Sequence, residues 1–257
     1  MGVRTWRTAA AALVAAGIAA TASAQGAREI MQEAQRRTEA RSQRYEGLLQ
    51  VINAKGLVTD KRWEYSRIGS HGSSKSVLRF TAPAEVKGVA LLVLNHPDRA
   101  SDQWMWTPAI ARDRRIALQD RSTRFFGTDF SFEDLEERDV DQYDFSLLGE
   151  ESMSGVACWR LEARPRQTKT SQYTRSRIWV RKDSYAYVQI ENDVRNQVVR
   201  RLKYEQLEQV QGIWTAKLLE MADLRRNSRT ILKLEQLQYN APMKDEDFTL
   251  QSLRRER

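Results

Sequence analysis

The hydrophobic pattern of the chain changes from helical to strand-like near Tyr45. Over residues 27–42, the apolar residues Ile30, Met31 and Ala34 recur at helical spacing among Glu, Gln and Arg, which predicts an amphipathic helix. Beyond Tyr45, short apolar runs and alternating apolar and polar positions are separated by turn residues. The pattern therefore predicts one N-terminal helix followed by a long series of strands.

We count about eleven strands along the chain. The run Ala90–Leu94 is continuously apolar, which is typical of a short buried strand. Turn residues recur at short intervals beyond residue 143, which is the rhythm of an antiparallel meander. The strands expected in this second half are 143–150, 156–163, 175–182, 185–193, 197–210, 213–223 and 229–239.

The segment 119–142 interrupts this rhythm. It contains four phenylalanines within eight residues, and its sequence Ser131-Phe132-Glu133-Asp134 resembles a helix start. We expect a loop with a short helix here. A long meander must close into a barrel, stack as a sandwich or cover one face with helices. We therefore predict an α+β fold, with a strongly curved sheet whose concave face is covered by helices.

The composition is that of a folded protein with little cysteine or histidine chemistry. The 257 residues are 41% hydrophobic and 30% charged, which supports a packed core. The single cysteine, Cys158, excludes an internal disulfide and a CxxC zinc site, and we expect it to be buried and inert. The two histidines, His71 and His96, lie far apart in sequence. We expect no metal and no cofactor.

The N-terminus has the pattern of a secretory leader. Arg4 and Arg7 precede an apolar stretch over residues 9–22, and Ala22-Ser23-Ala24 matches a signal-peptidase site. The alternative is a transmembrane anchor. Such an anchor needs about 20 apolar residues, which is more than the apolar stretch over residues 9–22 provides. We predict a signal peptide over residues 1–24, cleaved after Ala24, and one domain over residues 25–257. Because no cysteine lies at the cleavage point, we expect an exported protein without a lipid anchor.

No catalytic motif stands out. The chain lacks GxSxG, HExxH, P-loop and GxGxxG patterns, and its carboxylate pairs such as Glu133/Asp134 are more typical of helix starts. We predict no catalytic residue and no enzyme. A hydrolase would need two carboxylates converging in a cleft, which a sequence does not exclude. The formal charge of +8 suits acidic partners or anionic membranes, and also solubility alone, but no motif indicates nucleic-acid binding.

Aromatic residues near breaks in the pattern are the candidate ligand-binding residues. Each of them alone suits an ordinary core. A loop with four phenylalanines must nevertheless bury them, and on a curved sheet that implies a cavity able to accept an acyl chain when the loop lifts. The ligand-binding candidates are Trp63, Tyr65, Trp104, Trp106, Phe125, Phe126, Phe130 and Phe132. Gly127, Asp129 and Glu133 are expected to shape the lid.

Three segments resemble the LolA-like outer-membrane lipoprotein-sorting proteins. The stretch from Asp102 to Pro108, with Arg112 after it, is similar to that family's D-x-W-x-Y-x-P…R pattern. The block from Phe126 to Leu135, FGTDFSFEDL, is similar to the family's M-G-S-D-F-S-Y-E-D-L block. The strand from Gly155 to Pro165 resembles its G-x-x-C-x-x-L-E-x-x-P pattern. Trp106 and Phe126 depart from the family's tyrosine and methionine.

The resemblance implies a half-open antiparallel β-barrel, LolA/LolB-like, with helices over its mouth. It implies a periplasmic carrier that shields the acyl chains of a lipid or lipoprotein, and no enzyme. The partners it implies are an inner-membrane transporter of the RND/MMPL type and an outer-membrane acceptor, with the carrier a monomer. Two alternatives stay open: a non-enzymatic accessory protein of such a transporter without lipid cargo, and a hydrolase.

A basic stretch in the second half suits docking to anionic head groups. It comprises Arg195, Arg200, Arg201, Lys203, Arg225, Arg226 and Arg229. A solvated strand face would have the same composition, and sequence alone leaves both readings open.

Overall fold

A single antiparallel sheet dominates the computed structural model, which describes residues 26–255. Within that range the sheet has thirteen strands in the order β6-β5-β4-β3-β2-β1-β13-β12-β11-β10-β9-β8-β7. The strands are β1 (Ser42–Ile52), β2 (Val58–Ile68), β3 (Lys75–Ala82), β4 (Ala90–Leu94), β5 (Asp102–Thr107), β6 (Arg112–Arg115), β7 (Tyr143–Met153), β8 (Val156–Pro165), β9 (Arg175–Arg181), β10 (Tyr187–Val194), β11 (Gln197–Val210), β12 (Ile213–Asp223) and β13 (Ser228–Tyr239).

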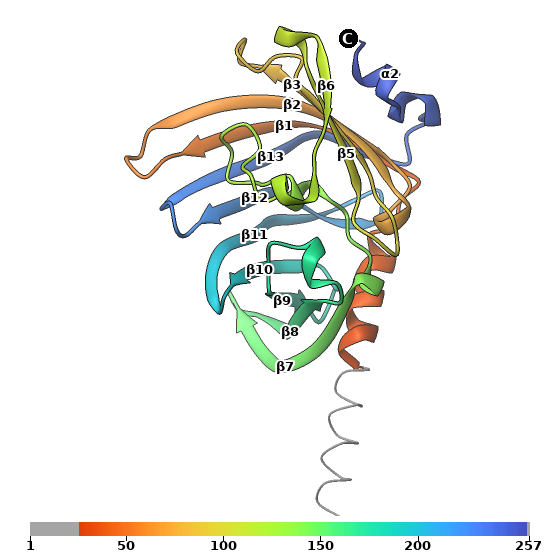
Figure 1. Ribbon diagram of the computed structural model, residues 1–257. Coiled ribbons are helices and arrows are strands. Elements are labelled where there is room, and N and C mark those ends of the chain that lie inside the picture. The colour runs from red at the N-terminus through yellow and green to blue at the C-terminus, as the bar shows by residue number, and fades with distance from the viewer. Residues whose placement is uncertain (1–25, 256–257) are drawn as a thin grey trace, which may run out of the picture.

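The sheet is strongly curved but does not close into a barrel. β6 and β7 form its two edges and do not pair with one another. Figure 1 shows the strands curving around a concave interior. The expected antiparallel meander is confirmed, whereas the expected count of about eleven strands is corrected to thirteen among the described residues. The short strand β6 reads Arg-Asp-Arg-Arg, so it lacks the apolar alternation that reveals a strand.

One helix and one irregular segment cover the concave face. Residues 26–37 are helical and bury Ala27, Met31 and Ala34 against β7–β10. The segment 117–142 crosses the other part of the interior (Figure 1, yellow-green). The expected cover of helices is therefore correct only in part, because this segment consists of loops and short 3-10 turns such as η4 (Glu133–Leu135).

The C-terminal residues cover part of the convex face instead. The turn η7 (Asp245–Phe248) and the short helix α2 (Leu250–Leu253) follow β13. Thr249 and Ser252 form a reciprocal capping box at the start of α2. Phe248 and Leu253 pack on Ala90 and Leu92 of β4, so the sheet is buried on both faces at this end. This double burial explains the continuous apolar run of β4.

One glycine allows the largest core side chain to lie flat on its neighbouring strand. Gly47 of β1 pairs with Trp63 of β2. A Cβ added at Gly47 would lie 2.1 Å from Nε1 of the Trp63 indole. The absence of a side chain at Gly47 therefore makes room for Trp63, which is 1% exposed.

The predicted signal peptide over residues 1–24 lies outside the described residues. In the part that the structure describes, no helix has the length and apolar character needed to cross a membrane.

Candidate functional site

The alternation of strand residues assigns the candidate aromatics to opposite faces of the sheet. Leu78 and Phe80 of β3 and Leu91 of β4 point into the concave interior. Trp104 and Trp106 of β5 point the other way and pack with the residues under α2 on the convex face. The structure therefore separates these two tryptophans from the phenylalanine segment, with which we had grouped them. The physical reason is the two-residue period of a strand, which places both on one face.

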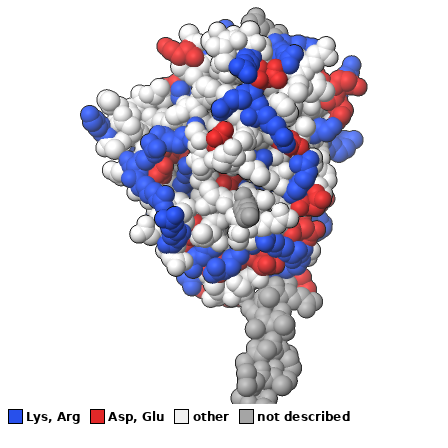
Figure 2. All heavy atoms as spheres, in the orientation of Figure 1, with Lys and Arg blue, Asp and Glu red and all other residues white. Residues whose placement is uncertain are grey.

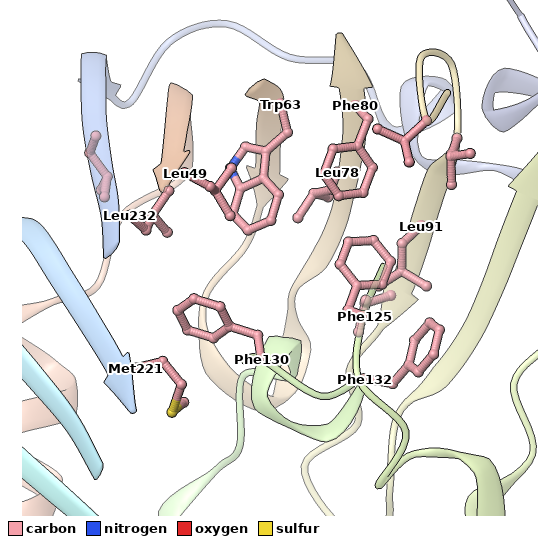
Figure 3. Packing of buried hydrophobic residues seen from close by; sticks show 14 of the residues in the cluster. Leu49, Trp63, Leu78, Phe80, Leu91, Phe125, Phe130, Phe132, Met221 and Leu232 are labelled. Atoms are coloured by element: carbon pink, nitrogen blue, oxygen red, sulfur yellow. The ribbon is translucent and has the colours of Figure 1, made fainter. Parts of the chain in front are cut away.

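The phenylalanine segment fills one half of the concave interior. We call residues 121–138 the interior plug. Phe125 is fully buried, and its ring stacks on that of Phe80 with 5.3 Å between the centroids. Phe126 and Phe132 meet Phe125 edge-on at 5.3 and 5.4 Å. Figure 3 shows Phe125, Phe130 and Phe132 facing Trp63, Leu78 and Leu91 across the interior.

The tip of the plug is a tight turn. Phe126 and Gly127 both have positive φ, at 46° and 78°. Glycine adopts such a conformation without steric cost, whereas the same conformation is strained at Phe126. Phe126 is half-buried and keeps its ring on Phe80 at 5.7 Å. The turn thus points one aromatic ring inward and leaves Gly127 in open space.

Three carboxylates fasten the plug to the sheet and to its neighbouring loops. Asp129 accepts hydrogen bonds from Ser228 and Thr230 of β13 and pairs with Arg124. Asp134 accepts from Arg200 of β11 and from the Tyr173 hydroxyl. Glu133 pairs with Arg138 and accepts from the backbone N–H of Gln172. Since these carboxylates are buried, each partner is needed to offset the cost of burying the charge.

A fourth carboxylate connects the plug to β5. Glu136 accepts from Arg121 at 2.8 Å and from the Gln103 amide at 2.9 Å. Gln103 also donates to the Phe132 carbonyl at 3.0 Å. Burial raises the pKa of Glu136, while Arg138 and Arg121 act against this shift. Gln103 is fully buried and directly precedes Trp104 in β5, so it faces the plug while Trp104 and Trp106 face away.

The other half of the interior contains a cavity. It measures about 220 Å³ and lies between the N-terminal helix, the end of the plug and strands β7–β12. Its wall is mainly apolar and aromatic, with Met31, Phe145, Ile178, Tyr187, Ile190, Leu202, Tyr204 and Met221 among its residues. Its polar lining includes plug residues Glu133, Asp134, Glu136 and Arg138. The plug is thus one wall of the cavity.

The tyrosines of the cavity wall stay neutral at ordinary pH. Burial raises the pKa of Tyr187 to about 12, and burial also raises the pKa values of Tyr143 and Tyr204. Tyr187 and Tyr204 meet ring to ring at 5.6 Å. The strand face that they form is therefore an uncharged aromatic surface, which suits a hydrocarbon more than a charged ligand.

The sequence did not single out these cavity residues. Strict alternation over residues 185–191 would put Tyr185 and Tyr187 on the face opposite Ile190. The bulge between Tyr187 and Gln189 shifts the register, so Tyr187 and Ile190 share the cavity wall. A bulge carries no clear sequence signal, which is why the alternation alone misplaced Tyr187.

The other predicted residues take ordinary structural positions. Tyr65 stacks on Tyr45 with 4.8 Å between the ring centroids, next to the core around Trp63. Cys158 is a free, buried thiol, as expected, and burial raises its pKa. Within residues 26–255, no group of three or more His, Cys, Asp or Glu side chains is placed to hold a metal ion.

Comparison with known proteins places this architecture in a family. Residues 72–255 match a family model described as "Uncharacterized protein". A domain from Vibrio parahaemolyticus, named for outer-membrane lipoprotein sorting, is similar at 26% identity and a TM-score of 0.86, covering 90% of this chain and 100% of that one. A DUF1329 family protein from Desulfovibrio piger gives the same identity and TM-score, covering 90% and 99%. No curated protein matches the chain.

A third structure shows the same fold at lower identity. A LolA superfamily protein from Nitrosomonas europaea has a TM-score of 0.72 at 19% identity, covering 88% of this chain and 98% of that one. The chain belongs to the LolA-like family of outer-membrane lipoprotein-sorting proteins.

In this LolA-like chain, two of the three motifs that carry the resemblance meet in space. The block from Phe126 to Leu135 forms most of the plug, and the Asp102–Pro108 motif forms β5 beneath it. Gln103 joins the two through its bonds to Phe132 and Glu136. The residues of the two motifs thus build one unit, in which a strand holds an aromatic segment against the inside of the sheet.

Proposed function

We propose that this LolA-like protein is a periplasmic carrier that binds the acyl chains of a lipid or lipoprotein inside its curved sheet. The observation that carries the proposal is the division of the interior, with a cavity in one half and a packed aromatic segment in the other. The name of the similar Vibrio parahaemolyticus domain supports the same role.

The energetics suit a carrier. Burying each CH₂ of an acyl chain contributes about 0.8 kcal/mol, so an apolar interior is enough to hold one. The cavity of about 220 Å³ is smaller than a typical small-molecule pocket of about 300–1,000 Å³. We infer that a longer chain also takes the space of the plug phenylalanines, which already form an apolar surface of the right kind.

The plug is attached in a way that permits such an exchange. Its apolar side contributes contact area to the core, whereas its position is fixed by the buried ion pairs and hydrogen bonds of its four carboxylates. A cargo chain would replace the apolar contacts of the plug with its own. Trp63, Phe125, Phe126, Phe130 and Phe132 are the proposed contacts, and Gly127, Asp129 and Glu133 shape the segment that moves.

The route of the cargo remains a prediction. The family resemblance implies export to the periplasm, an inner-membrane transporter of the RND/MMPL type as donor, and an outer-membrane acceptor. Because a groove of this kind needs no nucleotide, release would depend on an acceptor that binds the chain at least as well.

Lipid extraction tests the proposal. Protein purified from the periplasm of its host is extracted with organic solvent, and the extract is analysed by mass spectrometry. We expect acyl lipid or lipopeptide to co-purify in a stoichiometric amount. A delipidated sample is then titrated with a fluorescent fatty acid, and we expect saturable binding.

A pair of tryptophan substitutions on β10 tests whether the cavity binds the fatty acid. Ile190→Trp places a large ring in the cavity wall, whereas Gln189→Trp adds the same ring to the opposite face of β10. We expect the first to weaken fatty-acid binding at least tenfold and the second to leave it unchanged. If both variants bind fatty acid as the wild type does and no lipid co-purifies, the carrier proposal fails. The alternative function, a transporter accessory protein without lipid cargo, then replaces it.

A further inference from the structure

Two neighbouring hairpin tips expose apolar side chains that the fold leaves without cover. The β1–β2 hairpin ends in Leu57 and Val58, which are 64% and 56% exposed. The β12–β13 hairpin ends in Leu224, which is 42% exposed. These three are half of the six exposed large hydrophobic residues within residues 26–255. Isolated exposed leucines are ordinary, but a group at adjacent tips calls for an explanation.

The sheet register shows that the two tips lie side by side. β1 pairs with both β2 and β13, and its last residue, Ile52, lies opposite Val58 on one side and Arg229 on the other. β12 and β13 close their own hairpin at the pair Asp223 and Ser228. Both turns therefore lie at the same end of adjacent strands, at the left of Figure 1.

Basic side chains surround these apolar tips. Lys55 lies in the β1–β2 turn, Arg225 and Arg226 lie in the β12–β13 turn, and all three are exposed. Arg229 follows on β13, and Arg195 lies at the next tip, between β10 and β11. Figure 2 shows Lys and Arg gathered along the left edge of the molecule, where Figure 1 places these hairpins.

Few carboxylates neutralise this charge. Asp223 is buried, pairs with Arg226 and accepts from two backbone N–H groups of its own turn. Glu220 lies 3.7 Å from Arg229, and Asp60 of β2 is exposed and accepts from Gln50. Neither Lys55 nor Arg225 takes part in an ion pair within the range that the structure describes. The tips therefore carry a net positive charge.

We propose that the tips of the β1–β2 and β12–β13 hairpins form a docking surface for an anionic lipid bilayer. Leu57, Val58 and Leu224 enter the boundary between head groups and acyl chains. Lys55, Arg225 and Arg226 lie against the phosphates. Apolar side chains at a tip with Lys and Arg around them are the combination that binds at such an interface.

The same end of the sheet leads to the plug. A cleft of about 690 Å³ lies between plug residues 122–124 and the β12–β13 tip, with Arg124, Arg225 and Arg226 on its wall. Docking through the tips would therefore bring the bilayer to the side from which the plug is reached. This inference extends the proposed carrier function by naming the surface that meets the membrane, and vesicle binding can be measured without any cargo in the cavity.

Vesicle flotation tests the proposal with the full-length mature chain. We expect binding to vesicles that contain 30% phosphatidylglycerol in phosphatidylcholine, and at least tenfold weaker binding to phosphatidylcholine alone. Raising the salt concentration from about 50 to 500 mM should weaken binding strongly, since exposed charges are screened within a Debye length of about 10 Å at 0.1 M.

Charge variants separate the tips from the overall charge. Lys55→Glu with Arg225→Glu should weaken vesicle binding at least tenfold, since each basic residue near an anionic surface contributes about fivefold in affinity. Arg41→Glu with Lys244→Glu makes the same charge change on exposed residues at the other end of β1 and β13. We expect that control to bind vesicles within about twofold of the wild type.

Apolar variants test insertion of the tips. Leu57→Ser with Leu224→Ser should weaken binding several-fold, whereas Leu118→Ser with Leu148→Ser, two exposed leucines outside the tips, should not. If the two double charge variants lose vesicle binding equally, the attraction is non-specific and the proposal is wrong. Full vesicle binding by every tip variant would also overturn it. Fatty-acid binding by the tip variants should stay normal, so failure here is distinct from failure of the carrier function.

Discussion

Thr230 of β13 and Asp129 of the plug exchange two hydrogen bonds of 2.8 Å. The Thr230 hydroxyl donates to the Asp129 carboxylate and accepts from the Asp129 backbone N–H. Both residues are fully buried. One hydroxyl group therefore satisfies a buried charge and a buried donor together, which fixes the plug to the middle of the sheet.

Removing this hydroxyl should destabilise the fold more than its size suggests. Thr230→Val keeps the shape of the side chain but leaves the Asp129 N–H and one carboxylate lone pair without a partner. Since each unsatisfied buried group costs about 1–3 kcal/mol, we expect the free energy of unfolding to fall by about 2–4 kcal/mol in a urea titration. Thr59→Val, on an exposed position of β2, is the control and should change it by less than about 0.5 kcal/mol. If both substitutions change the free energy of unfolding by the same small amount, the two hydrogen bonds between Thr230 and Asp129 contribute little to stability.

The ion pair between Asp134 and Arg200 should control how readily the plug moves. Both side chains are almost fully buried, at 6% and 7% exposure. Breaking a buried pair by removing one partner typically costs about 3–5 kcal/mol, whereas replacing both partners costs less. We expect Arg200→Met to destabilise the protein strongly and Arg200→Met with Asp134→Leu to recover part of that stability.

Fatty-acid uptake provides the functional readout for this pair. In the double variant, the plug keeps its phenylalanines but loses the attachments of Asp134 to Arg200 and to the Tyr173 hydroxyl. We expect stopped-flow fluorescence to show uptake of a fatty-acid probe at least threefold faster than in the wild type. An uptake rate that is unchanged, in a variant that folds, would mean that the plug does not limit access to the interior.

Substitutions on the two faces of the sheet should separate stability from binding. Phe125→Ala removes a fully buried ring from the plug, and Trp104→Ala removes a ring from the convex face under α2. Truncation of a buried aromatic costs about 3–5 kcal/mol, so both should lower the melting temperature, although Trp104 is only half-buried and should lower it less. Only Phe125→Ala enlarges the concave interior. We expect it alone to change the affinity for long-chain relative to short-chain fatty acids, and equal changes in both variants would contradict the assignment of faces.

The sequence predicted the strands better than it predicted the site. β4 and β12 have the expected bounds, because a continuous apolar run and flanking turn residues act locally along the chain. The position of each aromatic residue was harder to predict. Trp104 and Trp106 have the same aromatic character as the phenylalanines, but they lie on the convex face of a strand, whereas the phenylalanines lie in a loop segment inside the sheet. The cavity wall depends on a bulge at Tyr187 and on contacts between β7–β12 and the N-terminal helix, which no single segment reveals.

The motif residue Asp102 should make the stability of the protein depend on pH in the acidic range. Its carboxylate accepts from Arg99 at 2.9 Å, from Arg115 at 2.5 Å and from His96 Nε2 at 3.0 Å, and so joins the β4–β5 loop to β6. The hydrogen bond from Arg99, together with those from Arg115 and His96, holds the pKa of Asp102 well below its usual range.

A carboxylate whose pKa is lower in the folded state binds its proton more tightly in the unfolded chain. Its stabilising contribution is therefore complete above the ordinary aspartate pKa of about 3.9 and is lost as the pH falls toward the folded pKa. We expect Asp102→Asn to lower the free energy of unfolding at pH 7 by about 1–2 kcal/mol, a modest figure because Arg99 and Arg115 are more than half exposed. The difference between the variant and the wild type should shrink below pH 4, as measured by urea titrations from pH 7 to pH 3. A difference that stays constant over this range would mean that Asp102 stabilises the loop through its shape and not through its charge.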